Sequence, residues 1–379
     1  MNMSSKVYGV LLVGGMRSHQ ENYARQFQSD PRCRLIAVAD QENAPVERIK
    51  LNQALADELD LPYQNLEIAL ERTDVDIVSL CPEVERRAEV SVLCAKAGKH
   101  LYLDKPLALN SSSAGKIVSA VHKSGVKAQM FSNVHCNWAK DAKTTLEEGK
   151  IGRLRAIHCD ITFAKGHIGS VKQQRRIDSG KRPRYTFAEA KPELFDIGVY
   201  AVSVINWITN QPVKSLVAIT GNYFFKEHLA HDVEDFGSII MELADGTTAT
   251  ISSGRFGWTS HPLGGIQKIK LVGNTGIVDF DANQPRLEVH AAEPSFQPPV
   301  PHPLDPMGMW SSTTNGIMPK NKWKPISGQN WIEEEFRSFI DAIDIGTPIE
   351  MTVELAAQSV EVITAAYHSA ASGQKINLT

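Results

Sequence analysis

The N-terminal third of the chain alternates short apolar runs with amphipathic segments. The apolar runs are typical of strands that are buried on both faces, and they occupy residues 7–13, 33–40, 75–81, 99–103 and 126–132. Helix-like amphipathic segments separate them, the first directly after a Gly-Gly pair and the others at 44–59, 83–98 and 111–124. Strands that alternate with helices of this length predict an α/β domain with a parallel, doubly wound sheet.

The second half follows a different pattern. After a predicted helix at 137–149, strand-like segments follow at 153–163, 213–225, 236–256 and 266–280. The sequences "ADGT" and "GNTG" supply the positive φ angles that hairpin turns need. We therefore expect an α+β domain with a large, open antiparallel sheet, one face of which packs on a helix or on a partner subunit.

Further helices and one proline-rich segment complete this half. Residues 193–209 have a largely apolar helical pattern, and two amphipathic helices are predicted at about 330–344 and 353–371. Residues 294–325 are rich in proline and predict a long surface loop.

Length, charge and cysteine content narrow the class of protein. A chain of 379 residues exceeds one ordinary core, so we expect a unit at 1–132, a second at 133–325 and closing helices at 326–379. A net charge of −3 lacks the basic excess that nucleic-acid binding needs. No apolar run reaches the length of about 18 residues that a transmembrane helix requires. Five scattered cysteines without a CxxC pair favour reduced thiols and a cytoplasmic protein.

Chemically distinctive residues gather where the predicted parallel strands end. The carboxyl ends of the strands are where doubly wound sheets bind their ligands. This edge holds Gly14, Gly15, Asp40, Pro82, Asp104, Lys105 and Asn133.

Two of these features together predict a dinucleotide site. Gly14 and Gly15 permit a tight turn into a helix whose N-terminal N–H groups can bind a pyrophosphate. The other two glycine positions of a G-x-G-x-x-G motif hold Met16 and His19, so a plain strand-to-helix turn explains the glycines equally well. Asp40 ends the second strand, where an acid can accept from a ribose 2′-OH, although a solvated loop aspartate is the alternative.

Three further groups of residues admit two interpretations each. The basic segment at 175–184 is either a solvated loop or a substrate lid. Asp196 and Tyr200 are four residues apart on one helix face, which suits a core tyrosine beside a capping aspartate as well as a site. His228, His231 and Asp232 could form a metal cluster, but a polar loop explains these residues as well. No metal is expected.

Two motifs of the chain, "AGKHLYLDKP" and "FDIGVYAVSVINWIT", carry a resemblance to a known family. The first resembles the AGKHV-x-x-EKP segment of the glucose-fructose oxidoreductase/inositol dehydrogenase/MocA family, and the second resembles that family's D-x-G-x-H or D-x-G-x-Y signature. "EEGKIGRLRAI" and "AAYHSAASGQ" extend the likeness across the rest of the chain. The resemblance implies a Rossmann domain followed by a mainly antiparallel domain, with NAD or NADP bound between them.

The resemblance also implies roles for single residues. Lys105 would hydrogen-bond the substrate oxygen beside the nicotinamide and Asp104 would lie near the cofactor, with Pro106 fixing the turn. Tyr200 takes the place of the family's catalytic histidine, as in glucose-fructose oxidoreductase and the dihydrodiol dehydrogenases, and Asp196 would orient it or the substrate. Because an ammonium favours a phenolate, we expect Lys105 to lower the pKa of Tyr200, which would carry the proton.

The expected binding residues follow from the same resemblance. Arg86 departs from the family pattern P-x-x-x-H, and His135 departs from N-x-R. Asp40 followed by Gln41, with no adjacent cation, predicts NAD over NADP. The expected cofactor residues are Gly14, Gly15, Met16, Arg17, Asp40, Pro82, Asp104, Lys105 and Asn133. The expected substrate residues are Lys105, His135, Asp196 and Tyr200.

The implied function is an NAD(P)-dependent oxidoreductase acting on CH–OH groups. The resemblance implies hydride transfer between a nicotinamide and a hydroxyl or keto group of a sugar, polyol or related compound. A catalytically silent relative that binds a sugar or nucleotide is the alternative. We expect a small sugar-like partner, no nucleic acid and no membrane, and a homodimer or homotetramer formed through the antiparallel sheet.

Overall fold

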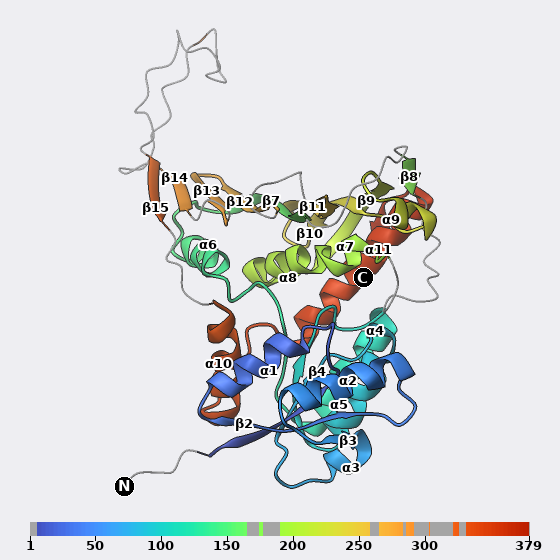
Figure 1. Ribbon diagram of the computed structural model, residues 1–379. Coiled ribbons are helices and arrows are strands. Elements are labelled where there is room, and N and C mark those ends of the chain that lie inside the picture. The colour runs from blue at the N-terminus through green and yellow to red at the C-terminus, as the bar shows by residue number, and fades with distance from the viewer. Residues whose placement is uncertain are drawn as a thin grey trace, which may run out of the picture.

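Two sheets, one above the other in Figure 1, organise the chain. The computed structural model describes residues 6–164, 174–176, 190–257, 265–282, 286–291, 303, 321–325 and 331–378. Most of the proline-rich segment and residues 177–184 of the basic segment lie outside these ranges, so the predicted surface loop and lid stay predictions. Within the described ranges, no helix has the length and apolar character that crossing a membrane requires.

The N-terminal sheet is parallel throughout, as predicted. Its six strands lie in the order β3-β2-β1-β4-β5-β6. They are β1 (Tyr8–Val13), β2 (Cys33–Asp40), β3 (Tyr63–Asn65), β4 (Ile77–Leu80), β5 (His100–Leu103) and β6 (Ala128–Met130). The sequence prediction missed β3, because Tyr-Gln-Asn has no apolar run and the strand is only three residues long. This strand order is that of the doubly wound dinucleotide-binding fold.

Helices connect the parallel strands and begin and end where local chemistry allows. They are α1 (Gln20–Ser29), α2 (Val46–Glu58), α3 (Leu66–Leu70), α4 (Val84–Lys96) and α5 (Ser111–Ser124). In α5, the Asn110 side chain accepts a hydrogen bond from the Ser113 backbone N–H, and Gly125 with φ 66° ends the helix. The helices predicted from periodicity are therefore confirmed.

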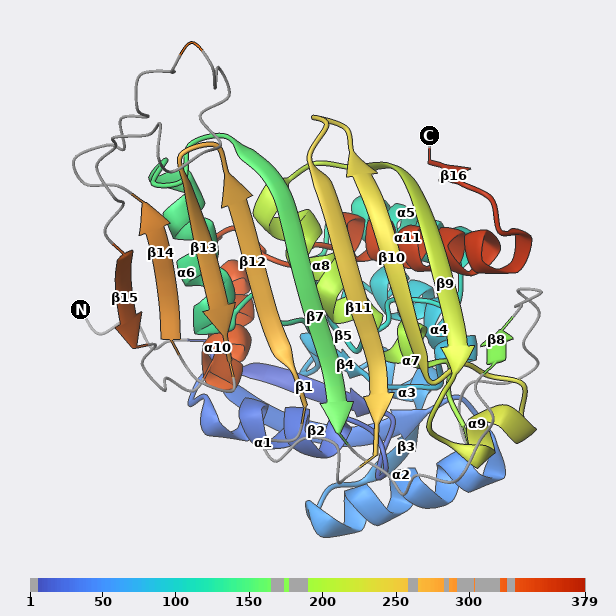
Figure 2. The ribbon, with the colours of Figure 1, turned by 90° about the horizontal axis from the view of Figure 1, so that it is seen from above.

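Within the described residues, the second sheet has ten strands and is mixed rather than purely antiparallel (Figure 2). Its main path runs β15-β14-β13-β12-β7-β11-β10-β9-β16, and β8 pairs with β9. The strands are β7 (Leu154–Ala164), β8 (Gln174–Arg176), β9 (Val213–Asn222), β10 (Phe236–Leu243), β11 (Thr248–Phe256), β12 (Gln267–Gly273), β13 (Gly276–Asp281), β14 (Arg286–Ala291), β15 (Asn321–Pro325) and β16 (Ile376–Asn377).

One pair in this sheet contradicts the expectation of successive hairpins. The hairpins β10–β11 and β12–β13 form at the two predicted turns. However, β7 lies between β11 and β12 and runs parallel to β11. Strand β7 enters the sheet from α6 (Asn137–Glu147), so no turn dictates its direction. The expected α+β class is confirmed, with one parallel pair at its centre.

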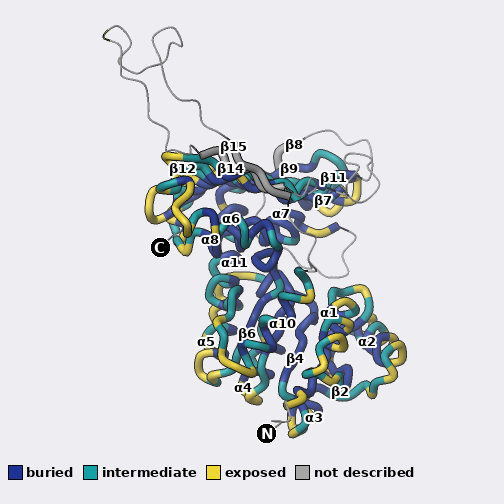
Figure 3. The backbone as a smooth tube through the Cα atoms, turned by 90° about the vertical axis from the view of Figure 1, so that its left-hand side faces the viewer, coloured by how far each residue is buried: buried dark blue, intermediate teal, exposed yellow. Residues whose placement is uncertain are grey.

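Helices cover the inner face of this sheet. In Figures 1 and 2, α6, α7 (Glu193–Asp196), α8 (Gly198–Thr209) and α11 (Val353–Ser372) lie between the ten-stranded sheet and the N-terminal half, with the short α9 (Lys226–Ala230) at one end. Figure 3 shows buried backbone through α8 and the adjoining strands. Val217, Ile219 and Ile240 are exposed, and Ile240 pairs with Val217 in the register of β9 and β10.

The C-terminal helices join the two halves. Helix α10 (Trp331–Asp344) returns to the N-terminal sheet, where Phe336, Phe339 and Ile340 are buried against Tyr102 and Phe27. Helix α11 packs against both α5 and α8, and the Met130 N–H donates to the Met351 carbonyl just before it. Both predicted C-terminal helices are confirmed, and they fix how the halves meet.

Candidate active site

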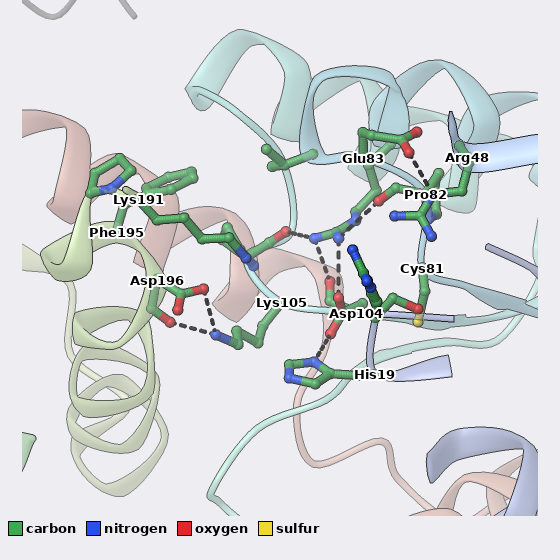
Figure 4. A pocket seen from close by; sticks show the side chains of 16 residues that line it. His19, Arg48, Cys81, Pro82, Glu83, Asp104, Lys105, Lys191, Phe195 and Asp196 are labelled. Carbon is green, nitrogen blue, oxygen red and sulfur yellow. Dashed lines mark hydrogen bonds and ion pairs between the residues drawn. The ribbon is translucent and has the colours of Figure 1, made fainter. Parts of the chain in front are cut away.

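A cleft of about 290 Å³ opens between the parallel strand ends and α7 (Figure 4). Four parts of the N-terminal half form one wall: the turn after β1, Arg48 of α2, the segment after β4 and the segment after β5. The approach to α7 forms the other wall. The lining residues are Arg17, Ser18, His19, Arg48, Cys81, Pro82, Glu83, Val84, Arg87, Asp104, Lys105, Pro106, Lys191, Pro192, Phe195 and Asp196.

The turn after β1 is too tight for side chains at its two glycines. Gly14 has φ +102°, and a Cβ there would lie 2.5 Å from the Cys81 carbonyl oxygen. A Cβ on Gly15 would lie 2.4 Å from the Leu51 carbonyl oxygen. The exposed Arg17, with φ 56°, follows and lines the cleft. The turn thus brings backbone and a cation to the N-terminus of α1, a suitable place for an anion.

Asp104 is held by partners that the sequence did not reveal. His19 Nδ1 lies 2.7 Å from Asp104 Oδ1, and the Tyr23 hydroxyl donates to the same oxygen at 2.9 Å. Arg87 donates to Asp104 Oδ2 at 3.1 Å and to the Asp104 and Pro106 carbonyls. Burial alone would raise the pKa of Asp104, but His19, Arg87 and Lys105 outweigh it and hold the pKa well below its usual range. The carboxylate is therefore a fixed negative charge.

His19 and Arg87 are site residues that sequence reasoning missed. In the sequence His19 stands out only as a departure from the glycine motif, yet its ring lines the cleft beside Asp104 (Figure 4). Arg87 is buried and holds the backbone around the cis peptide between Lys105 and Pro106. The signal that could have found His19 was its position at the N-cap of a helix that follows a strand end.

Lys105 spans the cleft to α7. Its Nζ donates to the Asp196 backbone carbonyl at 2.6 Å and to Asp196 Oδ1 at 2.9 Å (Figure 4). In an unbroken helix that carbonyl would accept from the Tyr200 N–H, but Tyr200 donates to Ile197 instead. The predicted helix over 193–209 is therefore interrupted between α7 and α8, and Lys105 takes the carbonyl that the break releases.

Asp196 carries a stable negative charge. Burial acts to raise its pKa, but the Lys105 ammonium, Lys191 and Arg255 outweigh burial, so the pKa of Asp196 lies well below its usual range. Arg255 Nη2 lies 3.6 Å from Asp196 Oδ2, and Arg255 also donates to the buried Glu193 at 2.8 Å. Lys105 and Asp196 therefore form a charged pair at the junction of the two halves.

Tyr200 lies beside this pair, but its predicted acidity is wrong. Lys105 Nζ stands 4.8 Å above the ring centroid of Tyr200, and Tyr200 does not line the cleft. Burial, followed by the negative charges of Asp104 and Asp196, raises the pKa of Tyr200 well above 10. The ammonium faces the ring rather than the hydroxyl, so it does not offset burial. Tyr200 is a neutral phenol in this arrangement.

Asp40 is also in a different environment from the one predicted. Arg86 makes a bidentate ion pair with it, at 3.0 Å to Oδ1 and 3.1 Å to Oδ2. The Asp40 side chain is fully buried in this pair. The expectation that no cation stands beside Asp40 is therefore wrong, because α4 brings Arg86 back over the end of β2.

Several other predicted residues lie away from the cleft. Pro82 lines it, whereas Met16, Asn133 and His135 do not. Asn133 and His135 are buried, and His135 Nε2 is 3.5 Å from the Ser338 hydroxyl of α10. The structure therefore places His135 against the C-terminal helix rather than beside Lys105.

The buried His135 gives stability a measurable pH dependence. Burial, with a smaller contribution from Lys140, lowers the pKa of His135 from 6.5 to about 3. The folded state then binds fewer protons than the unfolded state between these values, so the free energy of unfolding falls as pH falls from 6.5 toward 3. We expect His135→Gln to reduce that slope by about 1 kcal/mol per pH unit, measured by urea unfolding at several pH values. His158→Gln, at an exposed histidine, is the control, and an unchanged slope in His135→Gln would contradict this.

The residues of the possible metal cluster are not gathered. His228 Nε2 lies 3.1 Å from Glu193 Oε1, and His231 and Asp232 are exposed. Among the residues that the structure describes, no group of three or more His, Cys, Asp or Glu side chains is arranged to hold a metal ion.

Comparison with protein families matches both halves of the chain. Residues 8–132 match the family described as "Oxidoreductase family, NAD-binding Rossmann fold". Residues 139–279 match the family described as "GFO/IDH/MocA C-terminal domain". The chain belongs to the GFO/IDH/MocA oxidoreductase family. The predicted family and its NAD-binding Rossmann domain are confirmed.

Individual members of the family are distant from this chain in sequence. The dTDP-3,4-didehydro-2,6-dideoxy-alpha-D-glucose 3-reductase of Actinomadura kijaniata is 23% identical over 194 residues, 51% of this chain and 53% of that protein. The trans-1,2-dihydrobenzene-1,2-diol dehydrogenase of Xenopus laevis is 23% identical over 261 residues, 66% of this chain and 69% of that protein. The chain thus spans about half the length of the first curated relatives it matches.

A solved structure shares the fold over nearly the whole chain. GenD2 from gentamicin A biosynthesis, crystallised with NAD, superposes with a TM-score of 0.71 at 22% identity, covering 99% of this chain and 97% of that one. At this identity the likeness shows the fold of this GFO/IDH/MocA member and does not identify its substrate.

The cleft fits the pyrophosphate part of a dinucleotide better than its adenosine ribose. At the first, the two glycines leave no room for side chains, and Arg17 stands at the N-terminus of α1. At the second, the acid that should accept from a ribose hydroxyl is already paired with Arg86. The turn after β1 therefore suits a phosphate group, whereas the Asp40 carboxylate is already occupied by Arg86.

Proposed function

We propose that this chain transfers a hydride between NAD and a hydroxyl or keto carbon of a sugar, polyol or related compound. The observation that carries the proposal is the Lys105–Asp196 pair, which joins the end of a parallel strand to the second domain across the cleft. The names of the relatives, a sugar-nucleotide reductase and a diol dehydrogenase among them, support hydroxyl or keto substrates.

The proposed cofactor contacts are those of the turn and strand ends. Gly14, Gly15 and Arg17 would hold the pyrophosphate, and Pro82 and Asp104 would line the path toward Lys105. When bound, the nicotinamide supplies or accepts the hydride. Met16 and Asn133 stay in the predicted cofactor set, although neither lines the cleft.

The proposed proton carrier is Lys105. As an ammonium, Lys105 can donate a proton to the carbonyl oxygen of a keto substrate while hydride reaches the carbon. Asp196 keeps that ammonium in place through its carboxylate and its carbonyl. In the reverse direction, oxidation of an alcohol, the hydroxyl proton would return to the Lys105 amine.

Tyr200 has a supporting role in this proposal. A phenol whose pKa is raised by burial and by Asp104 and Asp196 is a poor base but a good hydrogen-bond donor. Its ring also lies beneath Lys105 Nζ, where it limits the positions of the ammonium. Tyr200 thus positions Lys105 from outside the cleft, and both Tyr200 and His135 stay predicted substrate residues.

Turnover of bound NADH or NAD separates this proposal from a silent relative that only binds a sugar or nucleotide. We expect purified protein to quench or shift NADH fluorescence and to change absorbance of the nicotinamide when sugars, polyols and their keto forms are screened. Binding without turnover on any substrate class would favour the sugar- or nucleotide-binding alternative, which the paired Asp40 supports. Binding of neither NADH nor NAD would contradict the proposal.

We propose that the outer face of the ten-stranded sheet contacts a second copy of the chain. Val217, Ile219 and Ile240 make an exposed apolar patch across β9 and β10. Such patches are rare on monomers and typical of interfaces. A monomeric mass in sedimentation equilibrium would contradict a homodimer or homotetramer.

We also propose a cytoplasmic location. All five cysteines of the chain are free thiols, and four of them are buried. Reduced thiols in this number suit a reducing compartment. Recovery of the protein in a membrane or secreted fraction would contradict the proposal.

A further inference from the structure

The carboxylate of Asp40 has its hydrogen-bonding capacity filled by the protein. Oδ1 accepts from the Gln41 backbone N–H at 2.8 Å and from Arg86 Nη1 at 3.0 Å. Oδ2 accepts from Asn52 Nδ2 at 2.9 Å and from Arg86 Nη2 at 3.1 Å. A carboxylate offers about four acceptor positions. A ribose hydroxyl can therefore reach Asp40 only by displacing one of these donors.

Arg86 is held as firmly as the acid that it covers. Its Nε and Nη2 donate to Glu83 Oε2 at 2.9 and 2.7 Å. Its Nη1 also donates to Gln41 Oε1 at 3.1 Å. With the two bonds to Asp40, these contacts engage all five donors of the guanidinium. Arg86 is thus a fixed part of the site rather than a mobile surface side chain.

The cluster of Asp40, Glu83, Arg48 and Arg86 stands between two hollows. Arg48 and Glu83, which pair at 2.6 Å, line the cleft. Asp40 lines an open groove of about 460 Å³ at the ends of β2 and β3, together with Gln41, Tyr63 and Ile68. Two arginines and two acids give the cluster no net charge.

A free acid at the end of β2 selects NAD in two ways. It accepts from the 2′-OH of NAD, and it repels the 2′-phosphate of NADP. In this chain Arg86 occupies the Asp40 carboxylate, so Asp40 cannot readily accept from the 2′-OH. Arg86 also neutralises the charge of Asp40, so the repulsion of a 2′-phosphate is lost. We propose that Arg86 sets how far this protein discriminates NAD from NADP, holding a preference for NAD that is weaker than Asp40 alone would give.

This inference rests on the proposed function only in requiring that the chain bind a dinucleotide. It reverses the usual interpretation of a strand-end acid: Asp40 anchors a guanidinium, and the guanidinium meets the adenosine end of the cofactor. Replacing Arg86 should therefore sharpen selection for NAD, because it frees Asp40 to accept from the ribose and restores its repulsion of a phosphate.

The test is the ratio of the dissociation constants of NADP and NAD, measured by fluorescence titration or calorimetry without substrate. We expect Arg86→Met to raise that ratio about tenfold over the unmodified protein, the effect of one lost charge neutralisation. Arg72→Met is the matched control. Arg72 makes a bidentate pair with Asp74, at 2.9 and 2.8 Å, and this pair does not line the cleft. The control should leave the ratio unchanged.

A second variant guards against misfolding of the first. Asp40→Asn removes the acid and leaves the Arg86 cation in place, so the ratio should move the opposite way, toward NADP. If the unmodified protein binds both dinucleotides and neither variant moves the ratio more than about twofold, the inference is wrong while the proposed function stands. If the unmodified protein binds neither dinucleotide, both are wrong.

Discussion

Lys105→Met is expected to lower turnover by about 10²–10⁴-fold, the usual effect of losing a positioned acid or base. Methionine keeps the length of the side chain and removes the ammonium that bonds Asp196 and faces the substrate. Asp196 would then lose its nearest cation, at 2.9 Å, and retain Arg255 at 3.6 Å. Affinity for NADH should change little, because the phosphate cradle at Gly14, Gly15 and Arg17 is untouched.

A matched lysine tests whether the effect belongs to the cleft. Lys214 makes an ion pair of similar length with Glu242, at 2.8 Å, on the exposed end of β9. Lys214→Met should leave turnover unchanged. Near-normal turnover in Lys105→Met would contradict the assignment and would move the proton to His19, which lines the same cleft beside Asp104. Tyr200→Phe should have a smaller effect than Lys105→Met, since its phenol stays neutral.

Phe336→Ala is expected to destabilise the protein by about 3–5 kcal/mol, the range for truncating a fully packed aromatic side chain. Phe336 is 2% exposed, and its ring centroid lies 4.4 Å from Tyr102 and 5.0 Å from Phe27. Truncation would open a cavity between α10 and β5, beneath the strand end that carries Asp104 and Lys105. The free energy of unfolding from denaturant titration measures the effect.

The residue directly after the same helix provides the control. Ile345 is 73% exposed, so Ile345→Ala should change the free energy of unfolding by less than about 0.5 kcal/mol. A loss below about 1 kcal/mol in Phe336→Ala would show that α10 is not part of the N-terminal core. That result would also contradict the joining role of the C-terminal helices.

Local chemistry explains why much of the fold followed from the sequence. Apolar runs locate β1, β2, β4 and β5, because strands that are buried on both faces need continuous apolar surface. The turns at "ADGT" and "GNTG" define two hairpins because their Gly, Asn and Asp residues adopt positive φ angles with little strain. The motif around Lys105 and the one around Asp196 predicted two sides of one cleft. In the structure, Lys105 Nζ lies 2.9 Å from Asp196 Oδ1.

Contacts between distant segments explain what the sequence did not determine. The direction of β7 beside β11 depends on how α6 delivers it, and no turn encodes that. The pKa of Tyr200 depends on burial and on where the Lys105 ammonium stands relative to the ring, which spacing along a helix does not give. Asp40 looked free because its partner, Arg86, comes from a helix 46 residues later.

The sequence by itself determined most of the elements, the family and part of the cleft, including Lys105 and Asp196, because these depend on short-range propensity and on motifs a few residues long. The tertiary structure alone decided which charges neutralise one another. Ion pairs such as Asp40–Arg86 and Asp104–Arg87 join separate strands and helices. Their energy depends on distances and burial that exist only after the two sheets have folded and α10 has packed against the first.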